Sequence, residues 1–216
     1  MTKIINGYKI EPGADLKWAN LKDANLEDAN LEGADLEDAN LVGANFWGAN
    51  LKWANLEGAY LDHANLSMTN LTCVKLKGAD LEGADLRDAD LEGANLEDAC
   101  LCGANLRGVI LEGAKLEDVD LIGANLKGAH LRGADLKGAK LEKANLNGAD
   151  LGLAWLQGAN LNGADLKGAN LYRANLNGAI FCRAVVSWAH FEGAKLKGAD
   201  FKDAIASPPF KDPNLP

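Results

Sequence analysis

Three histidines and four cysteines are the side chains of this chain best suited to chemistry, because such groups ligate metals or act as bases and nucleophiles. Their spacing matches no metal-ligand or disulfide motif. Cys100 and Cys102 flank the apolar Leu101, and a disulfide across such a pair is geometrically poor. We therefore expect no metal, no cofactor and reduced thiols, as in a cytosol. The residues concerned are His63, His130, His190, Cys73, Cys100, Cys102 and Cys182.

Aspartate and asparagine recur at every fifth position over much of the chain. Such regular recurrence favours a structural task, namely side-chain hydrogen bonds to nearby backbone or to stacked neighbours. No nucleophile, base and orienting group converge in the sequence, and no glycine-rich phosphate loop opens a helix. We therefore expect no catalytic residues and no enzymatic activity.

The elements that position these side chains follow from a strict period of five. Thirty-eight consecutive repeat centres run from Leu16 to Phe201, and 33 of them are leucine. Alanine stands two residues before almost every centre, and Asp or Asn stands one residue before it in 26 of the 38 repeats. A period of this kind calls for a repeat architecture.

Neither regular secondary structure can bury these leucines on one side. Five residues rotate by about 140° on a helix, and period-two alternation reverses the face of a straight strand every five residues. A bend in every repeat solves the problem. Twenty-two of the 24 glycines lie two residues after a centre, from Gly13 to Gly198, where a tight turn requires a positive φ. We expect a different turn geometry where this position is not glycine, as at Trp18, Asp23 and Asp28.

The runs ANLEDANLEGADLEDANL (24–41) and GADLEGADLRDADLEGANL (78–96) resemble the pentapeptide-repeat family. The resemblance implies an all-β fold, a right-handed quadrilateral parallel β-helix with four pentapeptides per coil and about 9.5 coils. At about 4.8 Å per coil, the rod would be roughly 45 Å long. We expect an N-terminal cap over 1–13, in which Tyr8, Ile10 and Pro12 close the first coil. An uninterrupted array follows over 14–205, with a C-terminal tail or cap over 206–216.

Charge is unevenly distributed over the expected surface. The chain carries a net charge of −9, which disfavours direct nucleic-acid binding. Residues stacked twenty apart form an acidic face that could bind a protein and a basic stripe that could bind an anionic partner; chance in a solvated repeat is the alternative. The acidic face comprises Glu37, Asp38, Glu57, Glu97, Asp98, Glu117 and Asp118. The basic stripe comprises Arg87, Arg107, Lys127 and Lys167.

Apolar residues outside the leucine pattern gather in two places. Near the C-terminus, Phe181, Phe191 and Phe201 replace leucine at the centres; they form either a plug for the terminal coil or the contact of a C-terminal homodimer, as in family members that dimerise. Leu153, Trp155 and Tyr172 form a smaller outward cluster, and such clusters can mark partner sites.

The expected function is a non-enzymatic structural or protein-interaction rod of unassigned biochemical role, a monomer or a C-terminal homodimer. The resemblance implies a bacterial protein, and the abundance of such proteins in cyanobacteria favours a cyanobacterial source. The sequence shows neither a signal peptide nor a transmembrane run, so we expect a cytoplasmic protein. The alternative is a DNA mimic that binds and modulates DNA gyrase, as fluoroquinolone-resistance members of the family do. The concentration of acid in one half and the absence of inserted loops weigh against that alternative.

Overall fold

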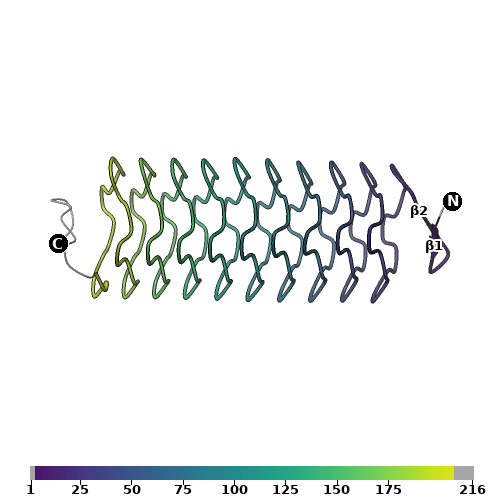
Figure 1. The fold of residues 1–216 in the computed structure, drawn as a ribbon, viewed down its shortest axis with the longest axis horizontal. Coiled ribbons are helices and arrows are strands. Elements are labelled where there is room, and N and C mark those ends of the chain that lie inside the picture. Colours follow the sequence, from purple (N-terminus) through teal and green to yellow (C-terminus); the bar gives the residue numbers. More distant parts are fainter. Residues whose placement is uncertain (1–2, 207–216) are drawn as a thin grey trace.

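The computed structural model describes residues 3–206 as one elongated rod of stacked coils. Figure 1 shows the coils following one another along the long axis, with a short hairpin at the N-terminal end. The hairpin consists of β1 (Lys3–Ile5) and β2 (Tyr8–Ile10), which pair antiparallel. Beyond the hairpin, pairing in the described residues occurs through single-residue parallel bridges, and no helix occurs within 3–206.

Parallel bridges join residues twenty positions apart along the whole array. The first joins Asp15 to Asp35 and the last joins Val185 to Ile205. Twenty residues are four pentapeptides, so each coil has four faces and four corners, and side chains twenty positions apart stack in one column. The prediction of a quadrilateral parallel β-helix is therefore confirmed.

The repeat centred on Leu106 shows how a pentapeptide with Asp or Asn before its centre satisfies its five backbone N–H groups. The N–H of Asn105 donates to the preceding coil (2.9 Å), those of Leu106 and Gly108 donate to the following coil (2.8 and 3.1 Å), and that of Ala104 closes the corner before it (3.1 Å). The remaining N–H, on Arg107, donates to the side-chain Oδ1 of Asn105 (3.4 Å). Because unpaired backbone donors are costly, this arrangement explains the residue type preferred one position before the centre.

The corners have one conformation, whether or not they contain glycine. Glycines at the corner position have φ values of 63–73°, and the other residues there have φ values of 53–60°. The turn hydrogen bond also persists, as the N–H of Ala24 donates to Leu21 across the corner at Asp23 (3.1 Å). The expectation of a different turn at Trp18, Asp23 and Asp28 is therefore wrong. Hydrogen bonds to the next coil hold the corners from Gly13 to Arg183 in place, so residues with a Cβ adopt the left-handed conformation there despite its steric cost.

Leucine and alanine fill the interior of the rod. From Leu16 to Phe191, every centre is buried, as is every position two residues before a centre from Ala19 to Ala189. A buried leucine contributes about 1.5–3 kcal/mol, so the regular column of centres is the main source of stability. Thr69 is the polar exception at the inner positions, and its Oγ1 donates to the carbonyl of Phe46 (2.8 Å).

Aromatic rings replace leucine in the last two coils. Phe181 and Phe201 stack with ring centroids 4.6 Å apart and an interplanar angle of 2°, and the edge-on ring of Phe191 lies about 6 Å from both. Rings of this size fill more of the interior than leucine does, and Phe201 remains only partly buried. This packing is compatible with a plug, and a part in self-association stays a prediction.

The N-terminal hairpin lies against the first coil. Ile10 is 6% exposed and joins the core, with Ile5 and Tyr8 packed against it. The hydroxyl of Tyr8 accepts a hydrogen bond from the N–H of Asn20 (3.3 Å), whereas Pro12 is exposed. The C-terminal segment predicted to be a tail or cap lies, from residue 207 onward, outside the described residues.

Candidate interaction surface

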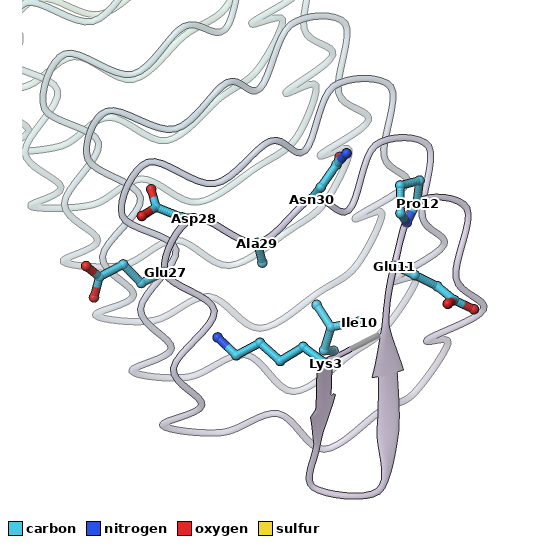
Figure 2. Close-up of a pocket in the computed structure, with 8 residues that line it drawn as sticks. All are labelled: Lys3, Ile10, Glu11, Pro12, Glu27, Asp28, Ala29 and Asn30. Carbon is cyan, nitrogen blue, oxygen red and sulfur yellow. The ribbon is translucent and has the colours of Figure 1, made fainter. Parts of the chain in front are cut away.

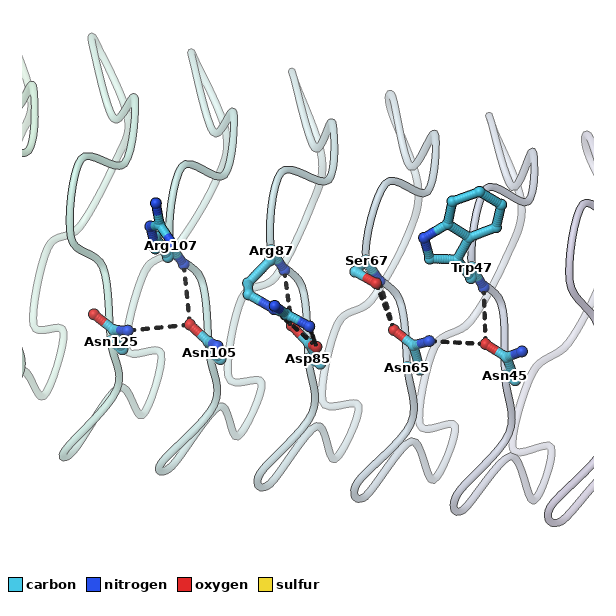
Figure 3. Close-up of polar contacts among 9 residues, drawn as sticks. All are labelled: Asn45, Trp47, Asn65, Ser67, Asp85, Arg87, Asn105, Arg107 and Asn125. Atoms are coloured by element: carbon cyan, nitrogen blue, oxygen red, sulfur yellow. Dashed lines mark hydrogen bonds and ion pairs between the residues drawn. The ribbon is translucent and has the colours of Figure 1, made fainter.

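The column of Asp and Asn side chains one position before the centres has a structural role, as the sequence predicted. Figure 3 shows one such column. Nδ2 of Asn65 donates to Oδ1 of Asn45 in the preceding coil (2.8 Å), and Asn125 donates to Asn105 in the same way (3.1 Å). The ladder of side-chain amides is interrupted at Asp85, whose carboxylate side chain has no N–H to donate. These side chains therefore bind neighbouring coils and corners.

Arg87 occupies the interruption of this ladder. Its Nε lies 2.8 Å from Oδ1 of Asp85, and its Nη2 lies 2.5 Å from Oδ2 (Figure 3). The side-chain hydrogen bond from Arg87 lowers the pKa of Asp85 below its usual value, because a nearby cation favours the ionised carboxyl.

The predicted acidic face occupies one column and the corner beside it. Bridges from Asp35 through Lys115 place Glu37, Glu57 and the later glutamates in one column. Lys77 interrupts this column between Glu57 and Glu97, and Lys17 precedes it. Lys17 Nζ lies 2.9 Å from Glu37 Oε2, and Lys77 Nζ lies 3.3 Å from Glu97 Oε2. The face is therefore a mixed ladder of both charges, and its use for binding remains a prediction.

The lysines at the two ends of this ladder were not singled out from the sequence. Lys17 precedes Glu37 by twenty positions, and Lys137 follows Glu117 by twenty. Lys137 Nζ pairs with Asp135 at 2.8 Å. The same twenty-residue spacing that defined the acidic face would have found both lysines.

The predicted basic stripe lies in another column. Arg87, Arg107 and Lys127 come from consecutive coils, and Lys167 lies two coils further along. Arg87 is neutralised by Asp85, and Lys167 Nζ lies 4.9 Å from the ring centroid of Trp188. Within residues 3–206, Arg107 and Lys127 have no carboxylate at ion-pair distance. The free cationic part of the stripe is therefore shorter than the sequence indicated.

The histidines and cysteines lie apart, with one exception. Bridges place His130 and His190 three coils from one another in a single column, and no group of three or more His, Cys, Asp or Glu side chains in the described chain could hold a metal ion. Cys100 and Cys102 are neighbours on the outer surface. Burial, with hydrogen bonds to Asp120 and Cys100, raises the pKa of the Cys102 thiol far above its usual range. A protonated thiol is a poor nucleophile.

A hollow lies between the N-terminal hairpin and the first coils (Figure 2). Lys3, Glu11, Glu27 and Asp28 contribute its charged groups. Lys3 Nζ donates to the backbone carbonyl of Asn25 (3.1 Å), so this lysine fastens the hairpin to the rod. We assign the hollow to the junction between the cap and the array.

Comparison with known proteins places the repeat in a family. The family model described as pentapeptide repeats matches the chain in 8 copies, over 13–48, 49–88, 69–108, 84–121, 114–152 and 149–187. The chain belongs to the pentapeptide-repeat family. Its β-helix is accordingly right-handed, as the resemblance implied.

Two solved structures of pentapeptide-repeat folds are similar to the whole array. HetL, a pentapeptide repeat protein involved in heterocyst differentiation regulation from the cyanobacterium Nostoc, is 38% identical, with 91% of this chain and 90% of that chain covered and a TM-score of 0.59. Full-length QnrB1, a plasmid-mediated fluoroquinolone resistance protein, is 18% identical, with 92% of each chain covered and a TM-score of 0.70. At that identity QnrB1 shows the fold alone. A comparison with curated proteins finds no match.

As a pentapeptide-repeat protein, the chain presents prism-like faces on which side chains recur in columns. The described residues contain no helix that is long and apolar enough to cross a membrane. The arrangement is suited to the recognition of other molecules. It holds charged, amide and aromatic side chains at the spacing of the coils, on a scaffold whose backbone N–H groups are largely paired.

Proposed function

We propose that this pentapeptide-repeat protein is a non-enzymatic rod that binds other proteins through its outer faces. The observation that carries the proposal is the ordering of outward side chains into columns, in which residues twenty positions apart stack on the same face. A rigid, preordered surface loses little conformational entropy on binding. None of the four cysteines is joined in a disulfide. Because thiols stay reduced in the cytoplasm, we propose a cytoplasmic location.

Modulation of DNA gyrase by DNA mimicry is the alternative function. A mimic of the duplex needs a continuous negative surface, because DNA carries one charge per about 1.7 Å of its axis. Lys17 and Lys77 form ion pairs within the acidic column, which favours the interaction rod over the mimic.

Affinity capture from the source organism tests the rod. The immobilised wild type is compared with a variant in which Glu37, Glu57 and Glu97 are changed to lysine, and with a variant in which Arg107 and Lys127 are changed to glutamate. Each charge reversal lies on the surface and leaves the interior unchanged. We expect a protein that the wild type retains and that one of the variants releases. Retention of the same proteins by all three would show that neither charged column makes the contact, and a wild type that retains no protein above the bare matrix would remove the proposal.

A gyrase supercoiling assay separates the two candidates. An interaction rod with another partner leaves supercoiling unchanged at micromolar protein. Inhibition of supercoiling, or protection of gyrase from a fluoroquinolone, would replace the rod with the mimic.

Self-association through the C-terminal end belongs to the same proposal. Ile205 is 58% exposed on the last described coil, and Ile180, which is 37% exposed, stands one position before Phe181. Light scattering on wild type and Ile205→Glu tests this contact without disturbing the stacked phenylalanines. A wild-type dimer that the variant dissociates supports the contact, and a wild-type monomer refutes it.

A further inference from the structure

The corner between Leu151 and Trp155 departs from the repeat in ways that reduce its stability. Leu153 occupies the corner position normally given to glycine and has a φ of 60°, a conformation that bulky residues avoid. Gly152 stands one position earlier, where the array otherwise has larger residues. Trp155 replaces the usual Asp or Asn, so it cannot accept the N–H of Gln157 through a side-chain oxygen. Residues that depart from local rules together indicate a function at that place.

Leu153, Trp155 and Gln157 line a shallow groove that spans three successive coils. The lining residues are Leu153, Trp155, Gln157, Arg173, Asn175 and Lys195. Leu153 is 38% exposed and Trp155 is 51% exposed. None of the six is acidic, although the chain as a whole has a net charge of −9. The groove therefore combines an apolar wall with a local excess of positive charge.

The two cations of the groove are available to an anion. Neither Arg173 nor Lys195 has a carboxylate within ion-pair distance among residues 3–206. The Arg173 guanidinium lies 5.1 Å from the ring centroid of Tyr172, which orients it without neutralising it. By contrast, Lys137 Nζ lies over the Trp155 ring (4.6 Å) and is also paired with Asp135.

Gln157 is a further departure at this place. Its side chain lines the groove, but its Oε1 is buried and accepts no hydrogen bond from any described residue. A buried acceptor without a donor is costly, so this oxygen adds to the local loss of stability and is not a contact for a ligand.

We propose that this groove is the docking site for a short acidic segment of a partner protein. An apolar side chain of the segment packs on Leu153 and Trp155, and its carboxylates pair with Arg173 and Lys195. The inference rests on the proposed function as a protein-binding rod and adds the place and the chemistry of the partner. The net negative charge of the chain opposes a nucleic acid as the occupant, because a polyanion is repelled over the rest of the surface.

Selection from a displayed library of random peptides tests the site. We expect peptides retained by the wild type to be enriched in Asp and Glu together with an apolar residue. Their affinity should fall by about tenfold or more for Trp155→Ala, as for a buried aromatic anchor, and by a similar factor for Arg173→Glu. Matched controls are Trp188→Ala, which removes an indole that is 55% exposed, and Arg183→Glu, at an exposed corner on another face. Both should leave the affinity unchanged, and thermal melts of all variants verify folding.

The outcomes separate this site from the general proposal. Acidic peptides that bind the wild type and Trp155→Ala equally would overturn the groove while leaving the rod as a protein-binding surface. A library without acidic enrichment would overturn the stated chemistry of the partner. If single-stranded DNA binds with the same dependence on Trp155, or if light scattering shows a wild-type dimer that Trp155→Ala dissociates, the occupant is a nucleic acid or a second copy and the proposal is wrong.

Discussion

Asn65 connects two coils and one corner with a single side chain. Its Nδ2 donates to Oδ1 of Asn45 over 2.8 Å, and its own Oδ1 accepts from the N–H (3.2 Å) and the hydroxyl (2.6 Å) of Ser67, as Figure 3 shows. The stacked amide therefore acts along the rod and around the coil at once. Three hydrogen bonds from one partly exposed side chain make it a sensitive position in the column.

Asn65→Ala should lower the free energy of unfolding by about 1–3 kcal/mol, because it leaves a backbone N–H and two side-chain groups without their partner. Chemical denaturation gives the value. The control is Lys75→Ala, at the equivalent position of another repeat, where the lysine is exposed and the change should cost little. Equal losses for the two variants would refute a structural role for the asparagine column.

Asp85→Asn should remove an acid-sensitive part of the stability. Arg87 holds the folded-state pKa of Asp85 below its usual value, so the pair stabilises the fold above the unfolded pKa of about 3.9. That contribution disappears as the pH falls through the lower, folded pKa. We therefore expect the wild type to lose stability relative to the variant on going from neutral pH to below about pH 4.

Thermal melts of wild type and Asp85→Asn across this pH range give the difference directly, because the other carboxylates are common to both proteins. Arg87→Gln removes the cation that lowers the pKa of Asp85. This variant should therefore lose less stability than the wild type between neutral pH and acid, as Asp85→Asn does. A difference that does not change with pH contradicts the assignment.

Gly48→Ala should destabilise the rod more than Gly128→Ala. Both glycines have nearly the same φ, 67° and 66°, so both substitutions carry the cost of a left-handed alanine, about 1–2 kcal/mol. A Cβ at Gly48 would also lie 2.5 Å from Oδ1 of Asp28 in the preceding coil, whereas a Cβ at Gly128 meets nothing within 4 Å. The Asp28 side chain would have to move.

The double variant Asp28→Gly with Gly48→Ala isolates the contact between the two corners. Relative to Asp28→Gly alone, the added alanine should cost no more than Gly128→Ala does in the wild type. Should the extra cost of Gly48→Ala persist in the double variant, the contact with Asp28 is not its source.

Leu106→Asp should lower the free energy of unfolding by about 4 kcal/mol or more, because it places an unpaired charge in the interior. Leu106 is fully buried, whereas the adjacent Arg107 is exposed. Arg107→Asp should therefore change stability by no more than about 0.5 kcal/mol. Calorimetry compares the two, and similar melting temperatures would contradict the assignment of inside and outside.

The period of five was sufficient to predict a bend in every repeat, whereas the four-sided coil and its right-handedness followed from the family resemblance. Leucine at 33 of the 38 centres, alanine two positions before almost every centre and glycine at many corners are compatible with one backbone path. Only a bend in each repeat keeps Leu16 and the later centres on the inside. The asparagine column could also be interpreted from recurrence alone, because the role of Asn105 repeats in many coils.

The tertiary structure decided what depends on contacts between coils. Trp18 and Asp23 adopt the same corner as glycine because the neighbouring coil holds their backbone, a constraint that intrinsic φ preferences do not contain. The groove at Trp155 likewise needs Arg173 and Lys195 from later coils, and the direction of a long side chain follows from its neighbours in the stack. Local sequence determines where the chain bends, whereas the pairing of bends twenty residues apart determines which side chains meet.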